Sequence, residues 1–373
     1  MTLICLISGQ LAPNLFSVIH LKPTQVILIH TLDTYREALH FKDILSQRYG
    51  IQHIQLKETK PFNPNQIIQD ADELRRELCG QKTILNYTAG TKPMAIQFVR
   101  VFEETDAKLL YVDTQQECFW WSQGDNTYSE PFDFHFGLPT LFDLENVSIR
   151  AQEDKNTIAD LASLTNLLFN ARKQDSNNQF RAFIKNAVSV RVNNHSLYQW
   201  NPSIRYKQVQ IQPKHDNPEA LMVRWNEEPF EYKNKAFWLT YFTGGWFEQW
   251  TYTVLDQLGI YDDVRCNLTI WPNQTEDTDK IKSEIDVAAI CNTIPVFLEC
   301  KTGRVNQKSV TNLKSMVDKY GPRYSEGAIV SFYPVTDAVI REKIEDYGLL
   351  LIEGPENLKS QLHTIHEEIL IKK

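Results

Sequence analysis

The sequence of 373 residues predicts an α/β protein that contains two separate sheets. In the first third of the chain, short apolar segments alternate with segments of helical periodicity, which is typical of a mostly parallel sheet covered by helices. Near residue 290, two apolar segments flank a polar turn and predict a β-hairpin, after which helix and strand patterns alternate to the end. A chain of this length is long enough for two or three domains with substantial cores.

The first sheet is expected to contain five strands. Short segments rich in β-branched residues predict these strands at residues 3–7, 25–29, 51–56, 83–87 and 109–112. Helical periodicity occupies residues 34–48, 65–79 and 93–104. Residues 117–121 could add an antiparallel strand at the edge. Ligands of such sheets bind beyond the carboxyl ends of the strands, so the loops at those ends are the first places to search for a site.

Composition and charge exclude several classes of protein. Apolar residues make up 42% of the chain and charged residues 23%, which argues against disorder. No apolar run reaches the roughly 18 residues of a membrane span, and the first ten residues lack the basic region of a signal peptide. The net charge of −8 argues against a protein that coats nucleic acid. Six scattered cysteines suit free thiols in a reducing cytoplasm.

The loop after the strand at 83–87 carries groups that favour an anion. Thr88 and Thr91 offer hydroxyls, Gly90 permits close backbone approach, and Lys92 adds positive charge where the next helix begins. The spacing is neither that of a Walker A loop nor G-x-G-x-x-G, so hydrolysis of a nucleoside triphosphate is not expected. A plain strand-to-helix turn would explain the glycine and Pro93, but not this density of phosphate-binding groups.

The hairpin near residue 290 brings carboxylates together. With the turn at Asn292-Thr293, Asp286 lies opposite Glu299 on one face, and Glu284 lies opposite Lys301. Two facing carboxylates repel each other and need a counter-charge, which a Mg²⁺ or Mn²⁺ ion with its preference for oxygen ligands supplies. The alternative is a surface hairpin whose charges face water, but the segment 296–298 is too apolar for that.

An Asp, a spacer of about a dozen residues and then Glu-x-Lys on an apolar strand resembles the core of the PD-(D/E)XK restriction-endonuclease-like superfamily. The matching residues are Asp286, Glu299 and Lys301, with Ile285 where the usual proline stands. The resemblance implies a metal-dependent nuclease in which Asp286 and Glu299 bind the metal and Lys301 stabilises developing charge. Such folds often contribute an acidic residue from a preceding helix. Glu248 matches it as a catalytic residue and metal ligand, unless it is simply a charge on the polar face of that helix.

The loop at 86–94 resembles the signature of CARF domains, the Rossmann-like sensors of cyclic oligoadenylates in type III CRISPR systems. The residues after the first strand, 8–15, are similar to the first ligand loop of that family, and the resemblance covers roughly residues 1–140. It implies that a cyclic oligoadenylate binds at Ser8, Gln10, Asn14, Asn86, Thr88, Gly90, Thr91, Lys92 and Met94. The expected domains are a CARF domain at 1–140, a connector at 141–235 and a nuclease domain at 236–373.

The middle of the chain has no assigned function. Residues 123–146 are expected to be an irregular connector, 157–188 to be largely helical, and 203–212 and 220–224 to be strands. The segment is either a small bridging subdomain or an elaboration of the nuclease. After the hairpin, a basic segment suits a phosphate backbone, although an ordinary solvated helix face explains it equally well. Its basic residues are Lys301, Arg304, Lys308, Lys314, Lys319 and Arg323.

Together the two resemblances imply a cytoplasmic nuclease that cyclic tetra-adenylate activates and that cuts single-stranded DNA, RNA or both with Mn²⁺ or Mg²⁺. A cyclic ligand with two-fold symmetry is best held by two copies of one surface, so we expect a homodimer. Two alternatives remain: a ligand-responsive regulator with an inactive nuclease fold, and an enzyme that cleaves its own cyclic ligand. The ring size of the activator, the preferred metal and the choice between DNA and RNA stay open.

Overall fold

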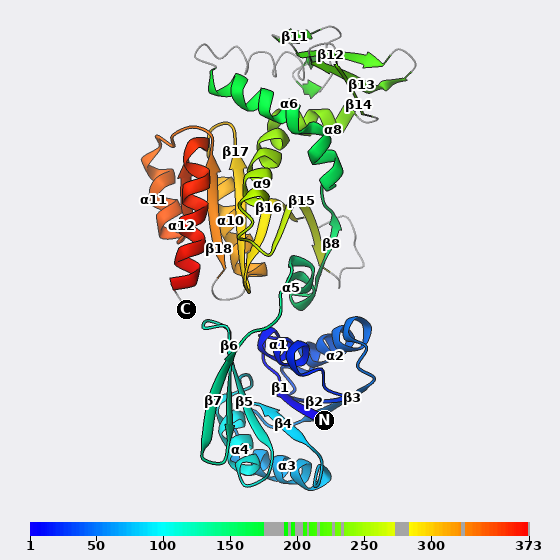
Figure 1. Ribbon diagram of the computed structural model, residues 1–373, viewed down its shortest axis with the longest axis vertical. Coiled ribbons are helices and arrows are strands. Elements are labelled where there is room, and N and C mark those ends of the chain that lie inside the picture. Colours follow the sequence, from blue (N-terminus) through cyan, green and yellow to red (C-terminus); the bar gives the residue numbers. More distant parts are fainter. Residues whose placement is uncertain are drawn as a thin grey trace.

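The computed structural model describes residues 1–174, 190–192, 195–197, 204–206, 209–214, 217–225, 228–232, 235–272, 283–321 and 325–371. The expected mixed α/β architecture with two large sheets is confirmed. Figure 1 shows the sheets one above the other along the long axis, with a small antiparallel sheet beyond the second. No helix in the described part of the chain combines the length and apolar character needed to cross a membrane.

The first sheet has seven strands in the order β3-β2-β1-β4-β5-β6-β7. Its strands are β1 (Thr2–Leu6), β2 (Gln25–His30), β3 (His53–Glu58), β4 (Thr83–Asn86), β5 (Lys108–Asp113), β6 (Cys118–Gln123) and β7 (Asn126–Pro131). The first five are parallel, and β6 and β7 continue the sheet in antiparallel fashion. All five residues of β1 are buried, because helices cover both faces of the sheet there.

Four helices cover this sheet, two on each face. They are α1 (Ala12–Leu21), α2 (Tyr35–Tyr49), α3 (Pro64–Glu77) and α4 (Lys92–Glu103). Helices α1 and α2 pack on the face that carries Leu3 and Leu28, and α3 and α4 pack on the face that carries Ile4 and Ile27. The five parallel strands and three helices agree with the expected segments to within a few residues. Helix α1 was not expected, since its first turns lie in the predicted ligand loop.

The second sheet has six strands in the order β19-β18-β17-β16-β15-β8. They are β8 (Val147–Ala151), β15 (Asp263–Pro272), β16 (Ser283–Cys291), β17 (Ile294–Lys301), β18 (Glu326–Ser331) and β19 (Leu350–Glu353). One face packs against α10 (Gln307–Tyr320) and α11 (Ala338–Asp346). The other face packs against α6 (Lys155–Lys173), α9 (Trp246–Leu258) and α12 (Leu358–Ile371). Short helical segments precede two of these helices: α8 (Lys235–Thr240) and the π-helical turn η1 (Tyr241–Gly245) precede α9, and the 3-10 turn η2 (Pro355–Asn357) precedes α12.

The segment between the two sheets is not an irregular connector, and the prediction for residues 123–146 is wrong. Strand β7 and helix α5 (Leu138–Leu144) both form there. The ring of Phe142 on α5 lies 6.4 Å from the ring of Phe297 and 6.3 Å from that of Tyr320, so α5 fills the core of the second sheet. Hydrogen bonds join the halves as well, because Glu117 Oε1 accepts from the backbone N and the hydroxyl of Thr293, each at 3.0 Å.

The elements in the middle of the chain belong to two different parts of the molecule, the second sheet and two small antiparallel sheets. Strand β8 pairs with β15 and helix α6 contacts α9, so both belong to the second sheet rather than to a bridge. The strands that follow form a two-stranded and a four-stranded antiparallel sheet, β9 (Val190–Val192) with β10 (His195–Leu197), and β11 (Ile204–Tyr206), β12 (Val209–Lys214), β13 (Asn217–Trp225) and β14 (Glu228–Tyr232). Much of the expected helix at 157–188 lies outside the described residues, and so does Arg323.

Replacing Phe142 tests whether α5 belongs to the core of the second sheet. We expect Phe142→Ala to lower the stability of that half by about 3–5 kcal/mol, because truncating a buried Phe leaves a cavity. Differential scanning calorimetry of the full chain measures the effect as a lowered unfolding temperature. Phe62→Ala is the matched control, since residue Phe62 is 73% exposed and the loss of its ring should change stability little. Equal behaviour of the two variants would contradict this role of α5.

Candidate active site and ligand site

The hairpin β16–β17 has the register that the sequence predicts. Val287 pairs with Leu298 and Cys291 with Ile294, so Asn292 and Thr293 form a two-residue turn. Asn292 adopts φ 58°, a left-handed conformation that Asn tolerates better than most residues. The backbone pairing of the two strands ends at Val287, and beyond it the Asp286 side chain makes a hydrogen bond to β17. Its Oδ2 accepts a hydrogen bond of 2.7 Å from the backbone N of Cys300.

Lys301 stands among three oxygens at the end of β17. Its Nζ lies 2.5 Å from Glu299 Oε1, 3.6 Å from Asp286 Oδ2 and 3.1 Å from the carbonyl oxygen of Cys300. The side chain of Asp286 is only 13% exposed and that of Glu299 is 16% exposed. The sequence predicts that Glu284 lies opposite Lys301, but in the structure Lys301 forms ion pairs with Asp286 and Glu299. Glu284 is exposed and lies across from Thr269 of β15.

Burial and mutual repulsion shift the protonation of this cluster. Removal from water raises the pKa values of Asp286 and Glu299, and for Glu299 the charge of Asp286 raises it further. The ammonium of Lys301 acts in the opposite direction on both. For Lys301 itself, desolvation lowers the pKa, but the two carboxylates outweigh that effect and raise it. The cluster therefore holds one firmly bound positive charge and two carboxyl groups that a second cation would stabilise.

An open cleft of about 580 Å³ gives access to these groups. Asp286, Glu299 and Lys301 line it from the hairpin, and Asn312, Ser315 and Lys319 line it from α10. Lys319 lies 4.9 Å from the centroid of the Tyr320 ring. Two other residues of the predicted basic segment are held in ion pairs, Lys314 with Asp318 and Arg304 with Asp337. The cleft thus combines carboxylates, the half-buried ammonium of Lys301 and polar groups, a set that suits a phosphodiester substrate.

Glu248 occupies the first turn of α9, on the opposite face of the sheet from α10. Burial raises its pKa well above the ordinary value, and the charge of Asp286 raises it further. A Cβ on Gly244 would lie 3.5 Å from Glu248 Oε1, so the carboxyl group packs against the backbone of the π-helical turn before α9. Glu248 does not line the cleft of Asp286 and Glu299. The structure links Glu248 to the cluster through the mutual effect of its charge and that of Asp286, and its role as a metal ligand stays a prediction.

A hard divalent cation suits the donor atoms of this cluster. The Lys301 ammonium already sits among Glu299 Oε1, Asp286 Oδ2 and a carbonyl oxygen, and such oxygens are the preferred ligands of Mg²⁺ and Mn²⁺. Over the described ranges, no three His, Cys, Asp or Glu side chains converge closely enough to form a ligand cluster by themselves. The residues thus match the ion in chemistry, with two side-chain oxygens and one backbone oxygen rather than three carboxylates.

Sequence reasoning missed Glu153, which follows β8. Its Oε2 accepts from Asn267 at 2.6 Å and its Oε1 from Gln249 at 2.7 Å. Burial raises its pKa, and its charge contributes to the raised pKa of Glu248. No local motif marks Glu153. It becomes visible only when β8 is known to pair with β15.

In the first sheet, the two predicted ligand loops meet at one point. The strand order reverses between β1 and β4, because the chain builds outward to β3 and then returns to the other side of β1. The loop after β1 leads to α1 on one face, and the loop after β4 leads to α4 on the other. Such a switch point leaves a crevice beyond the strand ends, where α/β sheets bind ligands.

Several residues predicted to touch a ligand also support the loops. Asn14, Asn86 and Met94 are buried, and Asn86 Nδ2 donates to Asn14 Oδ1 at 3.0 Å. The hydroxyl of Thr88 donates to Asn86 Oδ1 at 2.6 Å, and that of Thr91 donates to the carbonyl of Pro61 at 2.5 Å. These side chains therefore fix the geometry of the two loops, and their direct contact with a ligand stays a prediction.

The remaining predicted residues are less buried. Gln10 and Lys92 are exposed, and Ser8 is half-buried with its hydroxyl accepting from Gln10 N at 3.2 Å. Gly90 adopts φ 81°, and a Cβ there would lie 3.0 Å from Leu6 Cβ, so both conformation and space require glycine. Exposed amide, ammonium and backbone groups at a helix amino terminus form a surface that suits an anion.

The raised pKa of Glu248 gives a testable dependence of stability on pH. Folded Glu248 keeps its proton to a higher pH than in the unfolded chain, so its contribution is complete below its ordinary pKa and is lost as pH rises. Glu248→Gln stays neutral at every pH. In EDTA we therefore expect the variant to melt a few degrees above wild type at pH 8 and to lose this advantage at pH 5, where about 1 kcal/mol corresponds to about 2–4 °C.

Thermal melts across this pH range provide the measurement, and Glu342→Gln at an exposed position of α11 provides the control. A Glu248→Gln variant that is less stable than wild type at pH 8, or whose advantage does not change with pH, would refute the buried, destabilised carboxylate.

Comparison with known families assigns both halves of the chain. Residues 2–130 match the Card1 CARF domain, and residues 237–370 match the endonuclease domain of Card1-like proteins. No curated protein matches the chain. The CARF and nuclease resemblances of the two loops and the hairpin are thereby confirmed at the level of domains.

Solved structures share the fold over nearly the whole chain. Can2 from Sulfobacillus thermosulfidooxidans, solved with cyclic tetra-adenylate, aligns with a TM-score of 0.72 at 19% identity, over 97% of this chain and 98% of its own. Protein VC1899 from Vibrio cholerae aligns with a TM-score of 0.76 at 15% identity, over 100% of this chain and 98% of its own.

A type III CRISPR defence DNA nuclease activated by cyclic oligoadenylate aligns with a TM-score of 0.58 at 14% identity, over 97% of this chain and 51% of its own. At these identities the likeness establishes the fold alone. The two family models together span most of the sequence, and the chain belongs to the proteins that join a Card1 CARF domain to a Card1-like endonuclease domain.

Proposed function

We propose that this protein is a metal-dependent nuclease of type III CRISPR defence that a cyclic oligoadenylate switches on. The observation that carries the proposal is the half-buried cluster of Asp286, Glu299 and Lys301, which lines an open cleft within the endonuclease domain. The CARF domain on the same chain supplies the sensor. Two structures with the same fold, one a complex with cyclic tetra-adenylate and the other a nuclease activated by cyclic oligoadenylate, support this combination.

At the sensor end, the ligand would lie in the crevice between the loops after β1 and β4. Ser8, Gln10 and Lys92 would contact its phosphates and riboses, together with the backbone at Gly90. The buried network of Asn14, Asn86 and Thr88 would hold both loops in place. Cyclic tetra-adenylate is the first ligand to test. Its two-fold symmetry suits a homodimer with one crevice from each subunit.

At the nuclease end, Asp286, Glu299 and the carbonyl of Cys300 would hold Mn²⁺ or Mg²⁺, and Glu248 would influence them through its charge. A bound divalent cation would polarise the scissile phosphate and lower the pKa of an attacking water. Lys301 would donate to a phosphate oxygen and stabilise negative charge in the transition state. Asn312, Ser315 and Lys319 would position the strand along the cleft. The six cysteines, all within the described part of the chain and none of them in a disulfide, suit the reducing cytoplasm in which we place the protein.

A cleavage assay tests the whole proposal. Labelled single-stranded DNA, single-stranded RNA and plasmid are incubated with protein and Mn²⁺, with and without cyclic tetra-adenylate. Asp286→Asn and Glu299→Gln should each reduce cleavage by at least about 100-fold, the scale of losing one preorganised group at a reacting centre, while leaving ligand binding unchanged. Asp346→Asn, at an exposed position of α11, is the control.

Each outcome of this assay has a distinct meaning. Cleavage only with the ligand supports both the sensor and the nuclease, and the substrate that is cut identifies its class. Cleavage without any need for ligand would remove the switch. Ligand binding without cleavage would favour a regulator, and loss of the intact ring, followed by mass spectrometry, would reveal an enzyme that degrades its own activator.

A pair of lysines tests the ligand crevice. Lys92 follows the carboxyl end of β4 and Lys82 precedes its amino end, and both are exposed. Lys92→Gln should weaken binding of cyclic tetra-adenylate about tenfold or more, since a hydrogen bond to a charged group contributes about 1.5–3 kcal/mol. Lys82→Gln should leave it unchanged. Isothermal titration calorimetry on the full chain measures both, and equal affinities would place the ligand elsewhere.

A further inference from the structure

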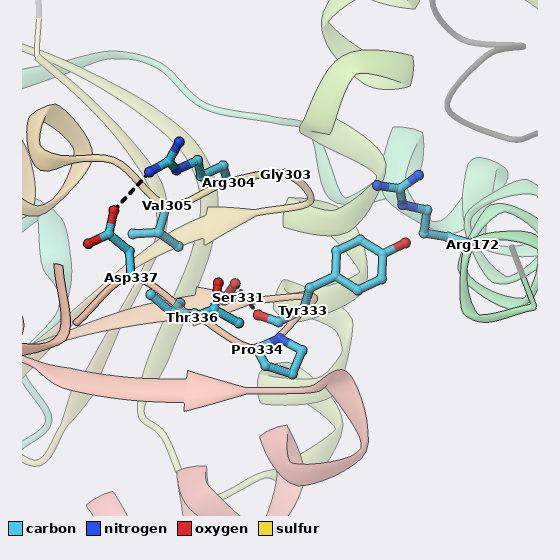
Figure 2. A pocket seen from close by; sticks show the side chains of 10 residues that line it. Arg172, Gly303, Arg304, Val305, Ser331, Tyr333, Pro334, Thr336 and Asp337 are labelled. Carbon is cyan, nitrogen blue, oxygen red and sulfur yellow. Dashed lines mark hydrogen bonds and ion pairs between the residues drawn. The ribbon is translucent and has the colours of Figure 1, made fainter. Parts of the chain in front are cut away.

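A second cavity opens at the carboxyl ends of β17 and β18, beside the nuclease cleft. Its volume is about 400 Å³, and Figure 2 shows the side chains that line it. Ser331 of its lining is the register partner of Lys301 in the parallel pair β17–β18. Because paired residues of neighbouring strands carry their side chains on the same face, the cavity begins one strand away from the Lys301 ammonium. It contains none of the carboxylates of the active-site cluster.

Tyr333 presents an aromatic ring in this cavity. The guanidinium group of the buried Arg172 packs against this ring and holds it in place, because the guanidinium carbon lies 4.8 Å from the ring centroid. Arg172 Nη2 donates to the carbonyl of Thr302 at 3.0 Å, which ties the arrangement to the residue after Lys301. The Tyr333 residue is nevertheless 37% exposed. A fixed and partly exposed ring is a surface on which a planar group can stack.

Arg304 supplies positive charge at the rim. Its side chain is 82% exposed, and its Nη2 lies 2.8 Å from Asp337 Oδ2, the contact marked by the dashed line in Figure 2. Asp337 also caps α11 by accepting from the backbone N of Val339. An ion pair this exposed contributes little to stability, so a phosphate group can replace Asp337 as the partner of Arg304 at small cost.

We propose that this cavity, the Tyr333 pocket, holds an unpaired nucleotide that neighbours the scissile phosphate. The base stacks on Tyr333, and the backbone phosphate pairs with Arg304, while the next phosphate reaches Lys301 in the cleft. The inference rests on the proposed nuclease function and assigns to Tyr333 and Arg304 the selection of the single strands that the sequence leads us to expect as substrate. In a duplex each base is paired and stacked on its neighbours, so it cannot enter the pocket. Stacking of this kind tolerates any base, so it confers selectivity for single strands without selectivity for sequence.

Binding of labelled oligo-dT tests the pocket without any need for cleavage. Fluorescence anisotropy in EDTA, on the full chain, gives the dissociation constant for an oligo-dT long enough to span both cavities. Tyr333→Ala should weaken binding about 5- to 100-fold, the range expected for losing one base–aromatic stack. Tyr333→Phe keeps the ring and should stay within about twofold of wild type. A matched duplex should respond to neither variant.

A second pair of variants leaves the core untouched. Arg304→Gln should reduce the slope of log affinity against log salt concentration by about 0.7, the value for one phosphate contact to a single strand. Asp337→Asn breaks the same ion pair but keeps the cation, and Asn also caps helices well, so the slope should remain. Thermal melts of all four variants show whether each one is folded.

The outcomes separate this inference from the proposed function. Unchanged oligo-dT affinity in Tyr333→Ala, an equal loss in Tyr333→Phe, or no binding of oligo-dT by wild type overturns the pocket, whether or not the protein cuts. A wild-type protein that binds oligo-dT through Tyr333 but cuts no substrate refutes the nuclease and supports the pocket. Cleavage of duplex at the same rate as single strands, with no effect of Tyr333→Ala, refutes the pocket and leaves the nuclease.

Discussion

The second half of the molecule depends on the ion pairs that the Lys301 ammonium forms with Asp286 and Glu299. Two largely desolvated carboxylates at the end of a hairpin would repel each other strongly, and removing one partner from such a group leaves an uncompensated charge. Lys301 holds Glu299 and Asp286 in one place, and Asp286 in turn fixes the backbone of Cys300. The same ammonium limits how much negative charge the cleft carries without an added cation, so the resting arrangement is stable while still suited to bind one.

The two ends of the molecule place their chemistry in similar ways. In each sheet, functional groups gather where parallel strands end, at β1 and β4 in one case and at β17 and β18 in the other. In the CARF domain, a buried hydrogen-bond network around Asn86 supports loops that expose Gln10 and Lys92. In the nuclease domain, ion pairs take that supporting role. A fully satisfied buried network fixes one loop geometry, whereas a charged cluster responds to added ions and protons.

The alternating pattern of the first third predicted β1 to β5, and apolar residues around a polar turn predicted the register that brings Asp286 near Glu299. Both depend on local periodicity, which a sequence displays directly. Helix α1 was missed because Ala12 and Pro13, which begin it, were interpreted as part of a loop. Strand β8, helix α5 and Glu153 were missed because each acquires its role from a partner more than a hundred residues away. The roles of Asn14 and Met94 likewise depend on burial, which the residue types alone do not reveal.

The pairing of β8 with β15 decides what counts as a separable unit of this protein. Val147–Ala151 lies outside the segments that match either family model, yet it is the outermost strand of the nuclease sheet. A fragment that begins at residue 237 would leave the backbone groups of β15 unpaired along one edge, and such an edge recruits other chains. Sensor and effector are therefore not interchangeable cassettes. A chimera that joins this nuclease domain to a different sensor domain must keep β8 with the nuclease domain.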